Sequence, residues 1–301
     1  MQSRSLIPAV AAALVVAGAI ACSGSDSTAP GSPSAAASFE SQASAELAPS
    51  AGEDVGSTYS FFSGADVTGS GGAFSVNAPG ATLTASGASA SINAPPPGAA
   101  AAWISPSCTF DAGTGRFACP PVTKGGMTFT ASYALFDANN VTQSSFDKVT
   151  TASINFIVTD SGAVSYSSNG NTFSDTTLRR HNRTVSGLAG DPDTVHVWNG
   201  TGTGSVRSSR SGQITKTYVF ASTDTVSNVA FRQPRDINPY PLRGTIVKSY
   251  TVTRTREASD TTTHTTTRRV VVTFNGTANV PMTVGTESYM LNLDTHKVTK
   301  Q

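Results

Sequence analysis

Residues 244–276 read GTIVKSYTVTRTREASDTTTHTTTRRVVVTFNG, two arms rich in Val, Ile and Thr on either side of a polar turn at 258–260. If the arms pair with Ile246 opposite Val272, then Lys248 meets Val270 and Tyr250 meets Arg268. Five apolar side chains then share one face, and a slip of one residue would scatter them over both faces. The stretch therefore predicts a long antiparallel hairpin, whose outer part, 253–267, holds no large apolar residue and projects beyond the core as a solvated ribbon.

The same alternation with a period of two occurs elsewhere in the chain. Apolar side chains alternate with small or polar ones over 127–135, 154–158 and 289–293. One apolar and one Thr- or Ser-rich face are typical of antiparallel strands with one buried side. We therefore predict an all-β fold, a long antiparallel meander that forms a curved open sheet, a sandwich or an irregular barrel.

Composition supports this fold class. Only 13% of the residues are charged and 38% are hydrophobic, whereas average globular chains have about 25% charged and 45–50% apolar residues. A coiled coil or helical bundle would need more Leu, Glu, Lys and Arg. The net charge of +1 conceals an asymmetry, because residues 1–175 carry 4 basic and 11 acidic residues while residues 176–301 carry 16 and 8. A basic half can attract anions over a long range.

Two of the three cysteines flank a short hairpin pattern. Cys108 and Cys119 enclose two arms around an Asp/Gly turn, and pairing of Phe110 with Phe117 would place the cysteines directly opposite each other. A non-hydrogen-bonded antiparallel pair brings its Cα atoms to roughly 4.5 Å, which is within disulfide range. We therefore predict a Cys108–Cys119 disulfide.

The amino terminus has the features of an export signal. Arg4 precedes an apolar run, 6–20, that is too short for a stable membrane span. The run ends in Ala-Ile-Ala-Cys at 19–22, which resembles the lipobox of bacterial lipoproteins and implies acylation of Cys22 after removal of a signal peptide, 1–21. By the same resemblance, Ser23 after the cysteine favours the outer membrane. The alternative is an ordinary secretory peptide cleaved after Ala21.

The pattern divides the chain into three parts. After the signal peptide, residues 22–57 are mostly Ser, Ala, Gly and Pro, a composition that buries too little surface to offset chain entropy, so we expect a disordered, flexible tether. Residues 58–301 are expected to form a single all-β domain. Within it, 58–123 is a region of short strands with the disulfide hairpin, and 124–301 is the long-strand meander.

Three segments carry a family resemblance. They are CTFDAGTGRFACPPVT (108–123), YALFDANNVTQSSFDKVTTASINFIVTDSG (133–162) and RTVSGLAGDPDTVHVWNGTG (183–202). In these segments the chain resembles a group of uncharacterised bacterial lipoproteins. The resemblance implies a lipid anchor and an exported β-rich domain, and it carries no established activity or site.

No constellation of residues predicts catalysis. The four histidines stand outside any HExxH or Cys/His spacing, so each is expected at the surface or packed on a strand: His181, His196, His264 and His296. The GxGxG run at 200–204 lacks a P-loop lysine and a βαβ unit, which favours a turn or bulge. Asp191 and Asp193 also fit a turn better than a calcium loop. We therefore predict no catalytic residue, no metal site and no cofactor.

Arginines supply the candidate binding surface. If the two Arg-rich hairpins are equivalent units of one sheet, seven side chains could form a basic stripe for phosphate or carboxylate groups of envelope polysaccharide or lipid: Arg179, Arg180, Arg183, Arg254, Arg256, Arg268 and Arg269. The alternative is a solvated sheet face that keeps edges from aggregating. Nucleic acid is not an expected partner, because no aromatic residues interleave the stripe.

These features predict an uncharacterised, lipid-anchored envelope lipoprotein at the outer membrane, with a non-catalytic structural or interaction role. Its expected partners are the membrane, through the lipid, and anionic envelope polysaccharide or lipid. One alternative is a β module that binds a lipid or another small hydrophobic ligand between sheet faces. A third is a hydrolase whose site has no recognisable motif.

Overall fold

The computed structural model describes residues 108–301, apart from 125, 169–170, 191–194, 212–214, 236 and 258–260. It also describes the helical residues 44, 45, 47–49, 51, 52, 54–56, 58, 59 and 62. The predicted signal peptide 1–21, Cys22 and the first part of the predicted tether lie outside the described residues.

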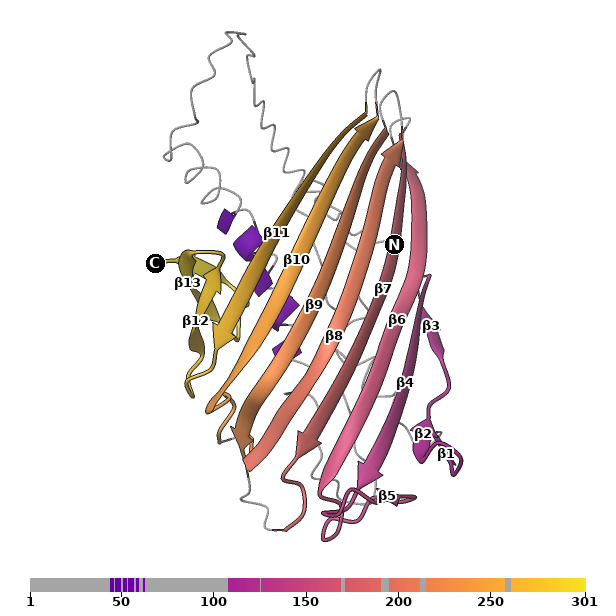
Figure 1. Cartoon of the computed structure of the whole chain (residues 1–301), viewed down its shortest axis with the longest axis vertical. Helices are drawn as coiled ribbons and strands as arrows, with labels where there is room; N and C mark the ends of the chain where they lie inside the picture. Colours follow the sequence, from indigo (N-terminus) through magenta and orange to yellow (C-terminus); the bar gives the residue numbers. More distant parts are fainter. Residues whose placement is uncertain are drawn as a thin grey trace, which may run out of the picture.

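The fold is all-β, as predicted, with every strand antiparallel to its neighbours (Figure 1). The sheet has 14 strands in the order β1-β2-β4-β6-β7-β8-β9-β10-β11-β12-β13-β14, with β3 and β5 also paired to β4. It is open and not closed into a barrel. The strands are β1 (Thr109–Asp111), β2 (Arg116–Ala118), β3 (Val122–Lys124), β4 (Met127–Phe136), β5 (Thr142–Gln143), β6 (Ser153–Ser168), β7 (Asn171–Ser186), β8 (Val195–Ser211), β9 (Thr215–Arg232), β10 (Arg243–Glu257), β11 (Thr261–Thr273), β12 (Asn279–Val284), β13 (Glu287–Asn292) and β14 (Val298–Lys300).

The register predicted for the longest hairpin is confirmed. Ile246 pairs with Val272, Lys248 with Val270 and Tyr250 with Arg268. The prediction of a projecting ribbon is wrong, because β9 continues beside β10 as far as the pair Glu257–Thr215. The Thr-rich outer arms are therefore part of a wide sheet whose long strands run side by side (Figure 1).

A helix within residues 44–62 covers one face of this sheet and lies behind it in Figure 1. Val55, Tyr59 and Phe62 are buried in the main hydrophobic core. The expected tether 22–57 is therefore wrong for its described part, and the expected strands do not begin at 58. Apolar residues four and seven positions after Val55 fall on one helical face, and the sheet supplies the surface that this face buries.

The last described residues of the helix pack against large aromatic side chains. The Phe62 ring lies 5.0 Å from that of Trp198 and 6.4 Å from that of Phe231, measured between centroids. The Tyr59 hydroxyl donates to the Pro239 carbonyl at 3.1 Å, and Arg235 donates to the Phe62 carbonyl at 3.1 Å. We call the sheet face that contacts this helix the inner face.

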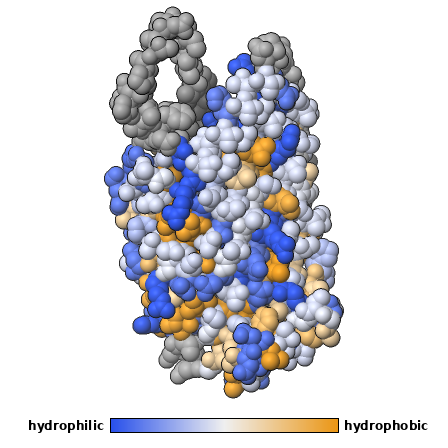
Figure 2. All heavy atoms as spheres, viewed as in Figure 1, coloured by the Kyte–Doolittle hydropathy of each residue, from blue (hydrophilic) through white to orange (hydrophobic). Residues whose placement is uncertain are grey.

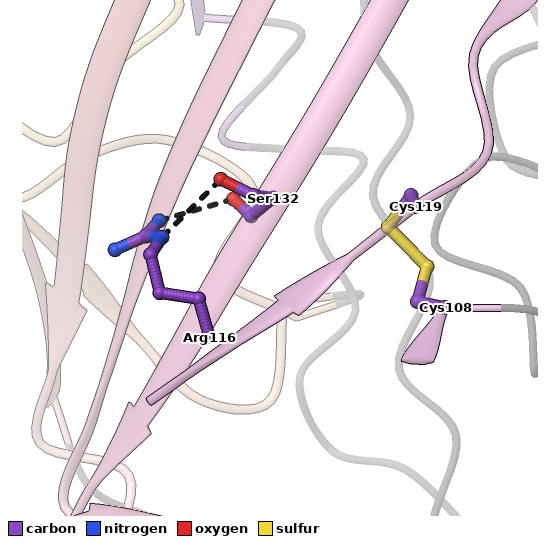
Figure 3. Close-up of a disulfide and its surroundings, with 4 residues drawn as sticks. All are labelled: Cys108, Arg116, Cys119 and Ser132. Atoms are coloured by element: carbon purple, nitrogen blue, oxygen red, sulfur yellow. Dashed lines mark hydrogen bonds between the residues drawn. A yellow bond between two sulfur atoms is a disulfide. The ribbon is translucent and has the colours of Figure 1, made fainter. Parts of the chain in front are cut away.

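The predicted disulfide hairpin is present at one edge of the sheet, and Figure 3 shows the bond between Cys108 and Cys119. Phe110 pairs with Phe117 in β1 and β2, and the Cα atoms of Cys108 and Cys119 lie 4.1 Å apart. The Phe117 ring stacks on Tyr133 of β4 at 4.5 Å. Alternation within two short arms was therefore sufficient to predict this pairing.

The opposite, outer face carries short polar side chains. Cross-strand hydroxyl pairs link β10 to β11, at 3.2 Å for Thr251 and Thr267 and at 3.1 Å for Thr253 and Thr265. Leu178 is 53% exposed on the same face. Figure 2 shows this face as mostly pale, with hydrophilic and hydrophobic residues scattered over it and no single large hydrophobic patch.

Candidate functional site

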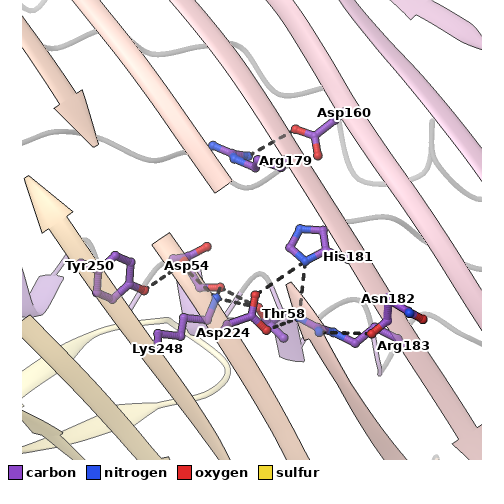
Figure 4. A network of polar contacts seen from close by, with 10 residues as sticks. All are labelled: Asp54, Thr58, Asp160, Arg179, His181, Asn182, Arg183, Asp224, Lys248 and Tyr250. Atoms are coloured by element: carbon purple, nitrogen blue, oxygen red, sulfur yellow. Dashed lines mark hydrogen bonds and ion pairs between the residues drawn. The ribbon is translucent and has the colours of Figure 1, made fainter. Parts of the chain in front are cut away.

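A row of side chains crosses the inner face from β7 to β10. His181 on β7 pairs with Gly202 on β8, Gly202 with Asp224 on β9, and Asp224 with Lys248 on β10. Residues in register on neighbouring strands lie within contact distance on one face. The register therefore brings together an imidazole, a carboxylate and an ammonium group, which Figure 4 shows near Asp54 and Thr58 of the helix.

Lys248 is the centre of one half of this cluster. It is 2% exposed, and its Nζ donates to Asp54 Oδ2 at 2.9 Å, to Thr58 Oγ1 at 3.0 Å and to the Asp54 carbonyl at 3.3 Å. The Tyr250 hydroxyl donates to the same Asp54 oxygen at 2.7 Å. Lys248 thus has three acceptors for its three N–H groups, all on the helix.

These contacts determine the protonation states. Burial alone would raise the pKa of Asp54, but the charge of Lys248 and the hydrogen bonds from Lys248 and Tyr250 leave that pKa below its ordinary value. Burial and the neighbouring Asp54 carboxylate raise the pKa of Tyr250 well above 10. At neutral pH Asp54 is therefore ionised and Tyr250 protonated, as the hydrogen bonds require.

Arg183 and Asp224 form the other half of the cluster. Arg183 is 1% exposed, and its guanidinium pairs directly with the Asp224 carboxylate. His181 Nδ1 lies 3.4 Å from Arg183 Nη2 and 3.8 Å from Asp224 Oδ1. Burial, reinforced by the charge of Arg183, lowers the pKa of His181 to about 4. His181 is therefore neutral at physiological pH.

A third ion pair lies one row farther along the strands. Arg179 on β7 is in register with Asp160 on β6, and Nη1 of Arg179 is 3.7 Å from Oδ2 of Asp160. Burial raises the pKa of Asp160, and the charge of Arg179 offsets part of this effect. Within the described part of the chain, the inner face between β6 and β10 thus holds the acid–base pairs Asp54–Lys248, Asp224–Arg183 and Asp160–Arg179.

The GxGxG run explains how long side chains fit over the middle of the sheet. Gly200, Gly202 and Gly204 on β8 pair with Arg183, His181 and Arg179. A Cβ on Gly202 would overlap the Asp224 carboxylate and approach His181 Nδ1 to 2.7 Å. The expected bulge is present at Gly200, where the register with β9 shifts. The other two glycines lie in regular strand and leave room for the charged groups.

The structure does not bring the seven arginines of the predicted stripe together. Arg179 and Arg183 are buried on the inner face in the pairs described above. The other members are divided between the faces: Arg180 and Arg269 are exposed on the outer face, whereas Arg254 and Arg256 lie on the inner face near the end of β10 and Arg268 lies on it opposite Tyr250.

Several members of the cluster were missed by sequence reasoning. From the sequence, Asp54 is expected in the tether and Lys248 and Tyr250 at ordinary strand positions, and no pattern singles out Asp224. Lys248 did carry a signal, because it alternates in phase with the buried residues Ile246 and Tyr250. A charged residue in an apolar row of a strand indicates a buried partner.

The histidines occupy four different environments. His181 belongs to the cluster, and His196 is buried, with Nδ1 2.9 Å from Gln233 Nε2. His264 is exposed, and His296 lies beside Gly56 of the helix. Among the residues that the structure describes, no group of three or more His, Cys, Asp or Glu side chains is placed to hold a metal ion. No helix in this part of the chain is long and apolar enough to cross a membrane.

Comparisons of the chain with family models, with curated proteins and with solved structures find no match.

Proposed function

We propose that this chain is a lipid-anchored lipoprotein of the bacterial envelope, held at the outer membrane through Cys22, with a non-catalytic structural or interaction role. One observation carries the non-catalytic part. The charged groups gathered on the inner face are directed at one another and at the helix, as in the contact between Lys248 and Asp54. Groups used in this way hold two elements together and leave little capacity for proton transfer to a substrate.

The helix also bears on the alternative of a small hydrophobic ligand. Such a ligand would need the apolar part of the inner face. Val55, Tyr59 and Phe62 occupy that region, and Phe62 lies against Trp198 and Phe231. This packing favours a structural or interaction role over a carrier role.

The lipid anchor is testable by direct chemistry. Cells that express the full chain are grown with a labelled fatty acid, and the purified protein is analysed by mass spectrometry of its amino-terminal peptide. We expect label on a peptide that begins at Cys22 and none in the Cys22→Ser variant. The Cys108→Ser, Cys119→Ser double variant is the matched control and should keep the label. An unacylated peptide that begins at Cys22 in the wild type would refute the anchor.

A further inference from the structure

Basic side chains cluster on the inner face where β8 and β10 end and β9 begins. Lys216 is in register with Arg210 on one side and with Arg256 on the other. Two residues closer to the helix along the strands, Arg254 is opposite His264. All of these side chains are exposed. We call this group, Arg210, Lys216, Arg254, Arg256 and His264, the distal patch.

The arrangement concentrates positive charge. Neighbouring strands lie about 4.8 Å apart, so Lys216 lies within one Debye length of about 8 Å at physiological salt from both Arg210 and Arg256. Like charges directly opposite each other destabilise a sheet. From β8 to β11, the other positions of these two rows are Ser208, Tyr218 and Thr262, and on β7 the row of Arg254 continues with the buried Asp175. A bound anion would offset the repulsion.

Aromatic side chains lie beside the cations. Tyr218 is in register with Arg254, and the Arg210 guanidinium carbon lies 5.4 Å from the centre of the Phe173 ring. Phe220 follows Tyr218 on the same face and contacts Tyr250, with ring centroids 5.2 Å apart. Aromatic rings interleaved with Lys and Arg suit a surface that is anionic at its boundary and apolar beneath it, which is the character of a membrane interface.

The first described residue of the helix, Ser44, lies on the side of the sheet that leads to this patch. The Ser44 hydroxyl lies 3.3 Å, and Arg268 Cδ 3.7 Å, from the point where a Cβ on Gly285 would lie. From there the helix runs away from the patch to Phe62, beside Trp198. Cys22 precedes Ser44 by 22 residues, which can span at most about 75 Å. An anchor at Cys22 is therefore within reach of the membrane that the patch would face.

We propose that the distal patch binds the phosphate headgroups of anionic phospholipids in the membrane that holds the anchor, an inference that rests on the proposed lipid anchor. A polybasic surface adds about 1 kcal/mol per Lys or Arg near an anionic bilayer, and it complements a lipid anchor as a second attachment. Binding at this end sets the long strands at a steep angle to the membrane and directs the opposite end of the sheet away from it.

The test uses the chain from residue 22 with Cys22→Ser, which keeps every described element and removes the acylation site. Cosedimentation is measured with vesicles of phosphatidylcholine alone and with vesicles containing phosphatidylglycerol, in 0.1 M and 0.5 M NaCl. We expect binding only to the anionic vesicles and weaker binding at high salt. The Lys216→Gln, Arg256→Gln double variant should bind about thirty-fold more weakly, the equivalent of about 1 kcal/mol for each charge.

The matched control is the Arg180→Gln, Arg269→Gln double variant, which removes the same charge from exposed positions on the outer face. It should bind within about three-fold of the parent. Equal losses in the two variants, or no binding of the parent to anionic vesicles, would overturn the proposal. A soluble anionic polysaccharide that binds the parent more tightly than the vesicles do would also overturn it, in favour of a glycan ligand. Because this protein carries no lipid, failure here is distinguishable from failure of the anchor at Cys22.

Discussion

Lys248 Nζ and Asp54 Oδ2 lie 2.9 Å apart and join the helix to the sheet across 194 residues of sequence. The side chain of Lys248 is 2% exposed and that of Asp54 is 13% exposed. Removing two charges from water costs several kcal/mol for each ion, and only close geometry and further hydrogen bonds offset that cost. Thr58 and Tyr250 supply those bonds. The pair therefore specifies where the helix docks.

We expect Asp54→Asn to lower the free energy of unfolding by about 3–5 kcal/mol, because it leaves the Lys248 charge buried without its counter-charge. Lys248→Met should lower it by a similar amount by stranding Asp54. Combining the two substitutions should cost less than the sum of the single losses, since neither charge is then left alone. Urea unfolding followed by circular dichroism measures all three values.

Glu287 and Lys300 provide the control pair. Their side chains are 2.6 Å apart but lie 24% and 49% exposed. Exposed ion pairs contribute about 0–1 kcal/mol, so Glu287→Gln should change the free energy of unfolding by less than about 1 kcal/mol. A loss as large as that of Asp54→Asn would mean that the buried location of the Lys248 pair is not what makes it important.

Sequence reasoning succeeded where the strands carry their own register. Ile246, Tyr250 and Val272 alternate with polar residues, so a single pairing buries them all, and the structure has that pairing. Sequence reasoning failed for the helix because it relied on the average composition of residues 22–57 and not on the spacing of their apolar residues. Val55 fell on one side of the expected boundary at 57 and Tyr59 on the other, although the two lie four residues apart on one helical face.

The cluster could be predicted only in part. The alternation places Lys248 on the apolar face of its strand, and it gives Arg183 the same phase as Val185. The acceptor for Lys248 comes from the helix, however, and no local pattern links Asp54 to a strand 194 residues away. The predicted stripe failed for a related reason, because Arg179 and Arg180 are adjacent and so point to opposite faces.

The half-buried His181 and the buried His196 lead us to expect a loss of stability on acidification. Burial and the charge of Arg183 lower the pKa of His181 to about 4, and burial and the charge of Arg235 do the same for His196. The unfolded chain protonates histidine near pH 6.5. Below that pH the unfolded state binds more protons, so the contribution is complete above about pH 6.5 and is lost as the pH falls toward 4.

Unfolding free energies measured between pH 7 and 4.5 should therefore fall, by up to about 1.4 kcal/mol per pH unit for each histidine. His196→Asn should reduce this slope, whereas His264→Asn, at an exposed position, should leave it unchanged. A wild-type stability that stays flat over this range would contradict the assignment of His181 and His196 as neutral groups in the folded protein.

We expect the disulfide to contribute to the free energy of unfolding. Cys108 and Cys119 close a loop with a sequence separation of 11, for which the chain-entropy model gives about 2–3 kcal/mol. The Cys108→Ser, Cys119→Ser variant should lose that amount in urea unfolding, and reduction of the wild type should reproduce the loss. If the variant unfolds like the oxidised wild type, the end of the sheet near β1 and β2 opens independently of the rest.

We expect that the charged cluster fits over β8 only because Gly202 has no side chain. Its Cβ, if present, would overlap the Asp224 carboxylate and lie 2.7 Å from His181 Nδ1. Gly202→Ala should therefore lower the free energy of unfolding by about 1–3 kcal/mol through overpacking. It should also displace the Arg183–Asp224 pair, which the chemical shift of the Arg183 guanidinium would report.

Gly204→Ala tests the same strand and face two residues away. There the Cβ would lie 2.9 Å from Ser222 Oγ and 3.5 Å from Arg179 Cγ. The hydroxyl of a half-buried serine can rotate away, whereas Asp224 is held by Arg183. We expect a loss below about 1 kcal/mol at Gly204, since a flexible neighbour relieves most of the overlap. Equal losses at the two positions would show that the Gly202 effect comes from the strand backbone and not from the charged cluster above it.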